Sequence, residues 1–121
     1  MDVLTWQERT CTVVQPAGDL DLSSAPRLQG ELDPLLDAPE APCLIVDLTK
    51  VPFCDSVGLG LLVHTLTRVR DARGRLALVV PPGMITHLLT ITNLDRHFTI
   101  YRSLDEARTA MSAGPVAQSG S

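Results

Sequence analysis

The chain of 121 residues has 45% apolar and 20% charged residues, a net charge of −4 and a pI of about 5.2. This length and balance are typical of one globular domain and exclude a wholly disordered chain. The acidic charge argues against a duplex-binding protein, and no apolar run reaches the ~18 residues of a membrane span. We therefore expect no nucleic-acid or membrane partner. We also expect a cytoplasmic protein, because the N-terminus shows no secretory signal.

The first third of the chain predicts strands followed by a helix. Residues 11–14 are β-prone, and Pro16, Gly18 and Asp19 are expected to interrupt or bend that run. Ser23 and Ser24 are candidate N-caps of the helix that follows. Its apolar residues recur at helical spacing: Leu28, Leu32, Leu35 and Leu36. An interior proline, Pro34, predicts that this helix ends or kinks just before it.

The middle of the chain predicts two strands around a long helix. Two apolar runs, residues 43–48 and 76–80, are too short for helices and predict buried strands. Between them, apolar residues at helical spacing predict a helix that Gly74 ends. These apolar residues are Leu59, Leu62, Val63, Leu66 and Val69.

The last third of the chain predicts a helix, a strand and a second helix. The first helix is short and is expected to end at a left-handed Asn93. Residues 97–101 predict the strand. Ser103 starts a capping box that opens a helix through about Met111. Residues 113–121 are small and polar and are expected to form a flexible tail.

The alternation of strands and helices over residues 43–112 predicts the fold class. Such alternation is the signature of βαβ units, which place parallel strands in one sheet through right-handed crossovers. The N-terminal segment leans antiparallel and is expected to add edge strands. The chain is therefore predicted to be one α/β domain over residues 1–112, with a small mixed sheet.

The segment between the strand ending at Leu48 and the long helix is the candidate functional site, because function gathers at the carboxyl ends of strands in α/β sheets. Asp55 or Ser56 can cap the helix. Gly58 and Gly60 leave its first turn without side chains, so a partner could approach the backbone closely. The positive helix end also favours a phosphate or a carboxylate. The simpler interpretation is that Asp55 and Ser56 only cap the helix.

The sequence shows no motif for catalysis or for cofactor binding. The glycines after Asp55 lack the third glycine of a dinucleotide fingerprint, and there is no P-loop or Gly-x-Ser-x-Gly sequence. The histidines are scattered, and no cluster of metal ligands is visible. We therefore expect no enzyme, no cofactor and no metal site. The cysteines, Cys11, Cys43 and Cys54, are expected to be reduced, buried hydrophobic residues.

Four segments carry a family resemblance through their order and spacing. They are residues 18–21 (Gly-Asp-Leu-Asp), the strand at 44–48, residues 55–60 (Asp-Ser-Val-Gly-Leu-Gly) and the stretch 89–107. The chain resembles the STAS-domain anti-sigma factor antagonists of bacteria over about residues 3–112. The resemblance implies a mixed four- to five-stranded sheet with about four helices packed against it.

The resemblance also implies a function. Proteins of this family bind an anti-sigma factor, often a serine kinase, and so release a sigma factor that acts in transcription. The implied contact surface comprises Asp21, Ser23, Ser24, Cys54, Asp55, Ser56, Val57, Gly58, Leu59 and Gly60. Asp21 can equally be interpreted as a carboxylate that holds the turn before the two serines. Substituting Gly58 by arginine is expected to abolish binding without unfolding the domain.

The family's switch is phosphorylation of the residue immediately before the signature glycine. That residue is Val57 here, which has no hydroxyl. Either Ser56 is phosphorylated instead or the switch is lost. We favour loss, because successive side chains at a helix start point about 100° apart. The alternative function is a nucleotide-binding or sensory STAS module, or a scaffold without sigma-factor control, and a weak homodimer is left open.

Overall fold

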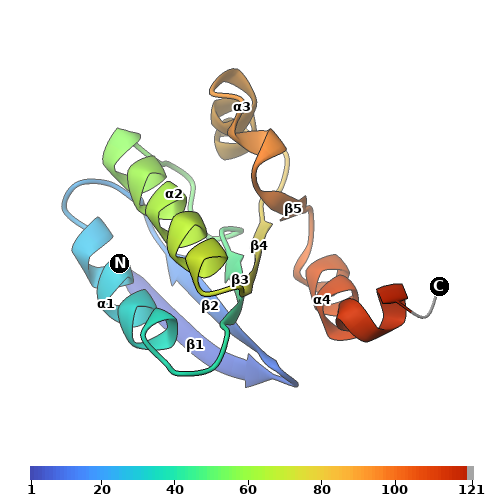
Figure 1. Ribbon diagram of the computed structural model, residues 1–121. Helices are drawn as coiled ribbons and strands as arrows, with labels where there is room; N and C mark the ends of the chain where they lie inside the picture. The colour runs from blue at the N-terminus through green and yellow to red at the C-terminus, as the bar shows by residue number, and fades with distance from the viewer. Residues whose placement is uncertain (120–121) are drawn as a thin grey trace.

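The computed structural model describes residues 1–119, with side chains described for residues 1–112, and consists of a five-stranded sheet between helical layers (Figure 1). The strands are β1 (Asp2–Glu8), β2 (Cys11–Ala17), β3 (Cys43–Asp47), β4 (Arg75–Val79) and β5 (Thr99–Tyr101). The helices are α1 (Ala25–Leu36), α2 (Ser56–Asp71), α3 (Met84–Ile91) and α4 (Leu104–Ser119), with a short 3-10 helix η1 (Leu94–Arg96).

The sheet has the strand order β1-β2-β3-β4-β5. β1 pairs antiparallel with β2 along its whole length, whereas the three other pairs are parallel. The chain crosses between the parallel strands through α1, through α2, and through α3 with η1. The predicted α/β class, with a mixed sheet and an N-terminal edge strand, is therefore confirmed.

Helices α1, α2 and α3 cover one face of the sheet, and α4 covers the other (Figure 1). Side chains alternate between the two faces along each strand. In β3, Val46 therefore packs under α1–α3 while Ile45 packs under Ala107 and Met111 of α4. β3 and β4 are buried on both faces, which is why their sequences are continuous apolar runs.

The predicted end of α1 before Pro34 is wrong. α1 continues through Pro34 to Leu36, because Pro34 lies in the last turn and Leu36 is anchored in the core. Pro34 leaves the Gly30 carbonyl oxygen without a helical N–H donor, and the bond from the Asp37 N–H to the Asp33 carbonyl oxygen at 2.9 Å closes the following turn.

β2 ends at Ala17, directly before Gly18, and continues through Pro16. Pro16 lies outside the segment of β2 that pairs with β3, so the ladder between β2 and β3 loses no hydrogen bond there. A kink or a bend at either proline stays a prediction.

The end of α2 also differs from the prediction. The left-handed residue after the helix is Arg73, with φ of 58°, and not Gly74. A glycine is needed next to it for another reason: a Cβ at Gly74 would lie 2.3 Å from the carbonyl oxygen of Pro42. The predicted left-handed Asn93 is confirmed, with φ of 61°.

Helix α4 begins as predicted and ends later. The backbone N–H of Glu106 donates to the Ser103 hydroxyl oxygen at 3.2 Å, as a capping box requires. The helix then runs past Met111 to Ser119. The predicted tail, 113–121, overlaps this helix. Residues 120 and 121 lie outside the described residues, and the flexibility of the tail stays a prediction.

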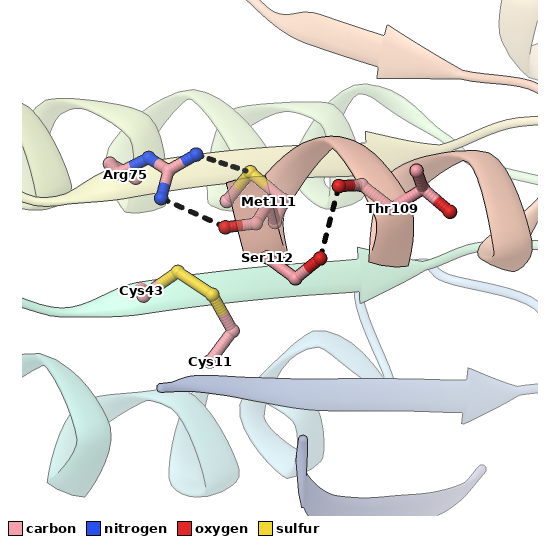
Figure 2. The surroundings of a disulfide bond; sticks show 6 residues. All are labelled: Cys11, Cys43, Arg75, Thr109, Met111 and Ser112. Atoms are coloured by element: carbon pink, nitrogen blue, oxygen red, sulfur yellow. Dashed lines mark hydrogen bonds between the residues drawn. A yellow bond between two sulfur atoms is a disulfide. The ribbon is translucent and has the colours of Figure 1, made fainter. Parts of the chain in front are cut away.

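The expected reduced state of Cys11 and Cys43 is wrong. The two residues form a disulfide between the first residues of β2 and β3, beside Arg75 and Met111 (Figure 2). Their Cα atoms are 4.6 Å apart, within the range that a disulfide spans. Cys54 is free and buried, as expected.

Candidate functional site

The carboxyl ends of β2, β3 and β4 lie side by side, and the loops that leave them lead into α1, α2 and α3. In Figure 1 these loops all leave the sheet at the same end. This is the edge at which open α/β sheets usually place their function. The predicted contact residues all lie on the first two of these loops or at the start of α2.

The first two loops are joined by backbone hydrogen bonds. Leu20 N–H donates to the Phe53 carbonyl oxygen at 2.8 Å, and Asp55 N–H donates to the Leu20 carbonyl oxygen at 3.1 Å. These bonds form a short parallel bridge between Leu20 and Cys54. Because the Leu20 side chain is fully buried, the bridge is anchored to the core. The two loops therefore form one surface.

Asp55 holds the start of α2 and the neighbouring loop at the same time. Its Oδ1 accepts the Gly58 N–H at 2.8 Å, which is an N-cap bond. Its Oδ2 accepts the Leu22 N–H at 3.1 Å. The capping interpretation of Asp55 is therefore confirmed. Ser56 is exposed, and its hydroxyl has no hydrogen-bond partner among the described residues.

We expect Asp55→Ala to destabilise the domain by about 1–2 kcal/mol, the usual cost of a lost N-cap. The Leu22 N–H would lose its partner as well. Ser56→Ala is the matched control and is expected to change the free energy of unfolding by less than about 0.5 kcal/mol, as surface substitutions do. Urea unfolding of the three proteins measures both effects, and equal midpoints would contradict the role of Asp55.

Asp21 holds its own turn. Its Oδ1 accepts hydrogen bonds from the Ser23 N–H at 3.0 Å, the Ser23 hydroxyl at 2.8 Å and the Ser24 N–H at 3.0 Å. The bonds from Ser23 and Ser24 lower the pKa of Asp21 below its ordinary value. The interpretation of Asp21 as a turn carboxylate is therefore supported, and its contact with a partner stays a prediction.

Two of the predicted contact residues are not on the surface. A Cβ at Gly58 would lie 2.5 Å from the Leu20 carbonyl oxygen and 3.0 Å from Cys54 Sγ, so the space beside Gly58 is filled by the chain itself. Cys54 is 3% exposed, and burial raises the pKa of its thiol to about 11. The side of Gly58 on which a Cβ would lie is therefore closed to a partner. Gly60 is exposed and has open space beside it.

The structure adds apolar residues that the sequence analysis missed. Leu22 is 71% exposed, Phe53 is 43% exposed and Val57 is 41% exposed, so three large apolar side chains project from the two joined loops. Met84, at the start of α3, is 43% exposed. One signal in the sequence could have identified an exposed apolar residue. Leu22 stands between the polar residues Asp21 and Ser23 in a turn. Only Val57 had been included in the predicted surface.

Three carboxylates border the same loops. None of the described residues forms an ion pair with Asp19, Asp21 or Asp55. In the described part of the chain, no three metal-ligating side chains come together. No helix there is long and apolar enough to cross a bilayer. The arrangement can therefore offer a partner an apolar surface with an acidic border.

The family model described as STAS domain matches residues 3–107. The match covers most of the chain and includes both joined loops and all of the sheet except Asp2. The chain therefore belongs to the STAS domain family, as the resemblance of its motifs implied.

Similar proteins are named as anti-sigma factor antagonists. A Thermotoga neapolitana protein named as a homologue of an anti-sigma factor antagonist is 39% identical over 53% of this chain and 57% of its own length. The chain thus matches little more than half of that relative. The anti-sigma-B factor antagonist of Bacillus subtilis is 37% identical over 67% of this chain and 72% of its own length. The crystal structure of an anti-sigma factor antagonist from Mycobacterium paratuberculosis superposes with a TM-score of 0.80 at 30% identity, covering 90% of this chain and 92% of that one.

Proposed function

We propose that this chain is an anti-sigma factor antagonist, which binds an anti-sigma factor and so frees a sigma factor for transcription. The observation that carries the proposal is the exposure of Leu22, Phe53 and Val57 on two loops that are hydrogen-bonded to each other. Exposed apolar side chains that gather at one place mark surfaces that meet another protein. The names of the relatives support an anti-sigma factor as that protein. We place this binding protein in the cytoplasm, although disulfides such as Cys11–Cys43 are rare in that compartment, and we assign it no enzymatic activity.

The proposed contact surface differs from the predicted one at a few positions. It keeps the exposed and half-buried members: Asp21, Ser23, Ser24, Asp55, Ser56, Val57, Leu59 and Gly60. It leaves out Cys54 and Gly58, which are buried, and it adds Leu22 and Phe53.

The carboxylates beside the start of α2 argue against the nucleotide-binding alternative. A phosphate at this helix end would lie near Asp55 and Asp21, which form no ion pair with any of the described residues. Repulsion between like charges would offset the attraction of the helix end. Calorimetric titration with GTP and ATP distinguishes the two functions, and saturable micromolar binding would favour the alternative.

A pull-down from lysate of the native host, with mass spectrometry of bait and partner, tests the proposed function. We expect an anti-sigma factor to elute with the wild-type chain and to be lost with a Leu22→Ala/Val57→Ala/Phe53→Ala variant, which gains no hydroxyl at the family's acceptor position. The thermal midpoint of the variant should stay close to that of the wild type, because all three side chains are exposed. Absence of any anti-sigma factor from the wild-type eluate would contradict the proposal.

We further propose that the phosphorylation switch of this loop is lost. A phosphate at the family's acceptor position adds nearly two negative charges where the partner must pack. The start of α2 tolerates that charge, whereas a desolvated interface does not. Val57 occupies this position and cannot accept a phosphate, so binding would escape this control.

We expect Val57→Ser to create a protein that the partner kinase phosphorylates, and whose phosphorylated form no longer binds it. Intact-mass measurement after incubation with the kinase and ATP detects the added phosphate. Val57→Ala is the matched control and should remain unmodified. No phosphate on Val57→Ser would count against the lost switch, and phosphate on Ser56 of the wild type would show that the switch has moved by one residue.

A further inference from the structure

A groove lies next to the candidate surface, beside the loop between β4 and α3, which is the third of the three loops at this end of the sheet. It has a volume of about 230 Å³ and lies between the β3–α2 loop and the β4–α3 loop. Its walls include Val51 and Pro52 on one side and Pro82 and Met84 on the other. Thr49 is the one polar side chain in the lining. A cavity of about 150 Å³ is enough to hold a benzene ring, so the groove can receive one large apolar side chain.

The groove is rigid. Pro52, Pro81 and Pro82 fix their own φ angles on both walls. The Thr86 hydroxyl donates to the Pro81 carbonyl oxygen at 2.8 Å and holds the second loop onto α3. Gly83 has φ of 155°, a conformation that a larger residue would adopt only under strain. A groove that is already shaped costs little conformational entropy when it is filled.

The groove is continuous with the two joined loops. Pro52 in its wall directly precedes Phe53, whose carbonyl oxygen accepts the Leu20 N–H. Met84 on the opposite wall is exposed to the same degree as Phe53, 43%. The apolar surface therefore extends from Leu22 across the first two loops to the start of α3.

The carboxylates beside the apolar surface indicate which charge a bound partner should carry. Asp19 is exposed and, like Asp21, has no ion-pair partner among the described residues. A second copy of the chain, related by a two-fold axis, would bring the same carboxylates against each other. Because the chain also carries a net charge of −4, electrostatics disfavour self-association through this face. An occupant with basic side chains beside an apolar one fits it.

We infer that the groove is an anchor site for one large apolar side chain of the anti-sigma factor, whose basic side chains face Asp19 and Asp21 on the neighbouring β2–α1 loop. The inference rests on the proposed function and extends its contact surface to the third loop. Met84 is then a specificity-determining residue, because it forms the exposed wall of the groove. A few anchor side chains that fill pockets carry much of the binding energy at interfaces.

The test compares two neutral substitutions on the same helix. Met84→Gln keeps the length of the side chain and removes its apolar character, and Ile91→Gln removes an apolar side chain at a 62% exposed residue outside the groove. The probe is a purified anti-sigma factor of the same organism that binds the wild-type chain. We expect calorimetry to show binding at least 10-fold weaker for Met84→Gln, unchanged for Ile91→Gln, and largely restored for Met84→Leu. Asp19→Asn should slow association at low salt and reduce its salt dependence.

The outcomes separate the inference from the proposed function. If the wild type binds and Met84→Gln binds within twofold of it, the inference is wrong while the proposed function stands. If no anti-sigma factor binds the wild type, both fail. If sedimentation shows a wild-type dimer that Met84→Gln dissociates, the groove is an interface between copies and the inference is overturned. Both positions are exposed, and matching thermal midpoints will show that the variants are folded.

Discussion

Gly58→Arg is expected to unfold the domain, although Gly58 lies in the segment that the sequence predicts as a contact surface. A Cβ at this position would lie 2.5 Å from the Leu20 carbonyl oxygen and 2.7 Å from Leu20 Cγ. The carbonyl cannot move away without losing the hydrogen bond from Asp55 N–H. Overpacking costs up to about 3 kcal/mol for the methyl group of Gly58→Ala. A buried, unpaired guanidinium adds several kcal/mol more, out of a total stability of about 5–15 kcal/mol.

Gly60 provides the matched control in the same helix turn. No atom lies within 4 Å of a Cβ at this position. We therefore expect Gly60→Ala to stabilise the domain by about 0.5–1 kcal/mol, because alanine is the better helix former. Urea unfolding with a common slope measures both alanine variants. Equal stability of Gly58→Ala and the wild type would show that the contact with Leu20 does not exist.

The contact surface is better tested with an arginine at Gly60 than with an arginine at Gly58. Loss of binding by Gly58→Arg would report an unfolded protein and would say nothing about the contact surface. Gly60→Arg places the same side chain in open space, one helical turn after Ser56. We expect this variant to keep its fold and to lose the anti-sigma factor, because a long charged side chain would project into the interface.

Reduction of the Cys11–Cys43 disulfide is expected to lower the free energy of unfolding by about 3–4 kcal/mol. The two cysteines are 32 residues apart in the sequence, and a loop of this length corresponds to that loss in the chain-entropy treatment of cross-links. Urea unfolding with and without dithiothreitol measures the difference. We expect the reduced protein to stay folded in dilute buffer, because both cysteines lie in a packed sheet.

A Cys11→Ala/Cys43→Ala variant separates the cross-link from other effects of the reductant. Its unfolding midpoint should be the same in both buffers, since Cys54 is free and buried. Alkylation of the unfolded, unreduced wild type should modify one cysteine. Modification of three cysteines would show that the disulfide is absent.

The periodicity of apolar residues was enough to predict the fold class, because α2, β3 and β4 each carry a clear pattern. The disulfide could not be predicted from spacing. It depends on the register that places Thr12 beside Leu44, which is a contact between strands far apart in the sequence. The roles of Gly58 and Gly74 were missed for the same reason. Each glycine meets a carbonyl oxygen of a distant segment, Leu20 and Pro42 respectively.

The candidate site was predicted in part. Asp55 carries a local signal, because an aspartate directly before a predicted helix can accept the backbone N–H of the residue three positions later. The bond from the Gly58 N–H confirms this cap. The exposure of Leu22, Phe53 and Met84 depends on which loops meet at the end of the sheet. An apolar residue looks the same in a sequence whether it is buried or exposed. The apolar surface therefore required the fold.

The cross-link and the contact surface occupy opposite poles of the parallel strands. Cys11 and Cys43 start β2 and β3, whereas the loops that bear Leu22 and Phe53 follow the other ends of these strands. A five-residue strand is about 16 Å long, and substitutions more than about 10 Å apart usually act independently. The stability of the domain can therefore be changed at the disulfide, by evolution or by engineering, without changing the specificity of the contact surface.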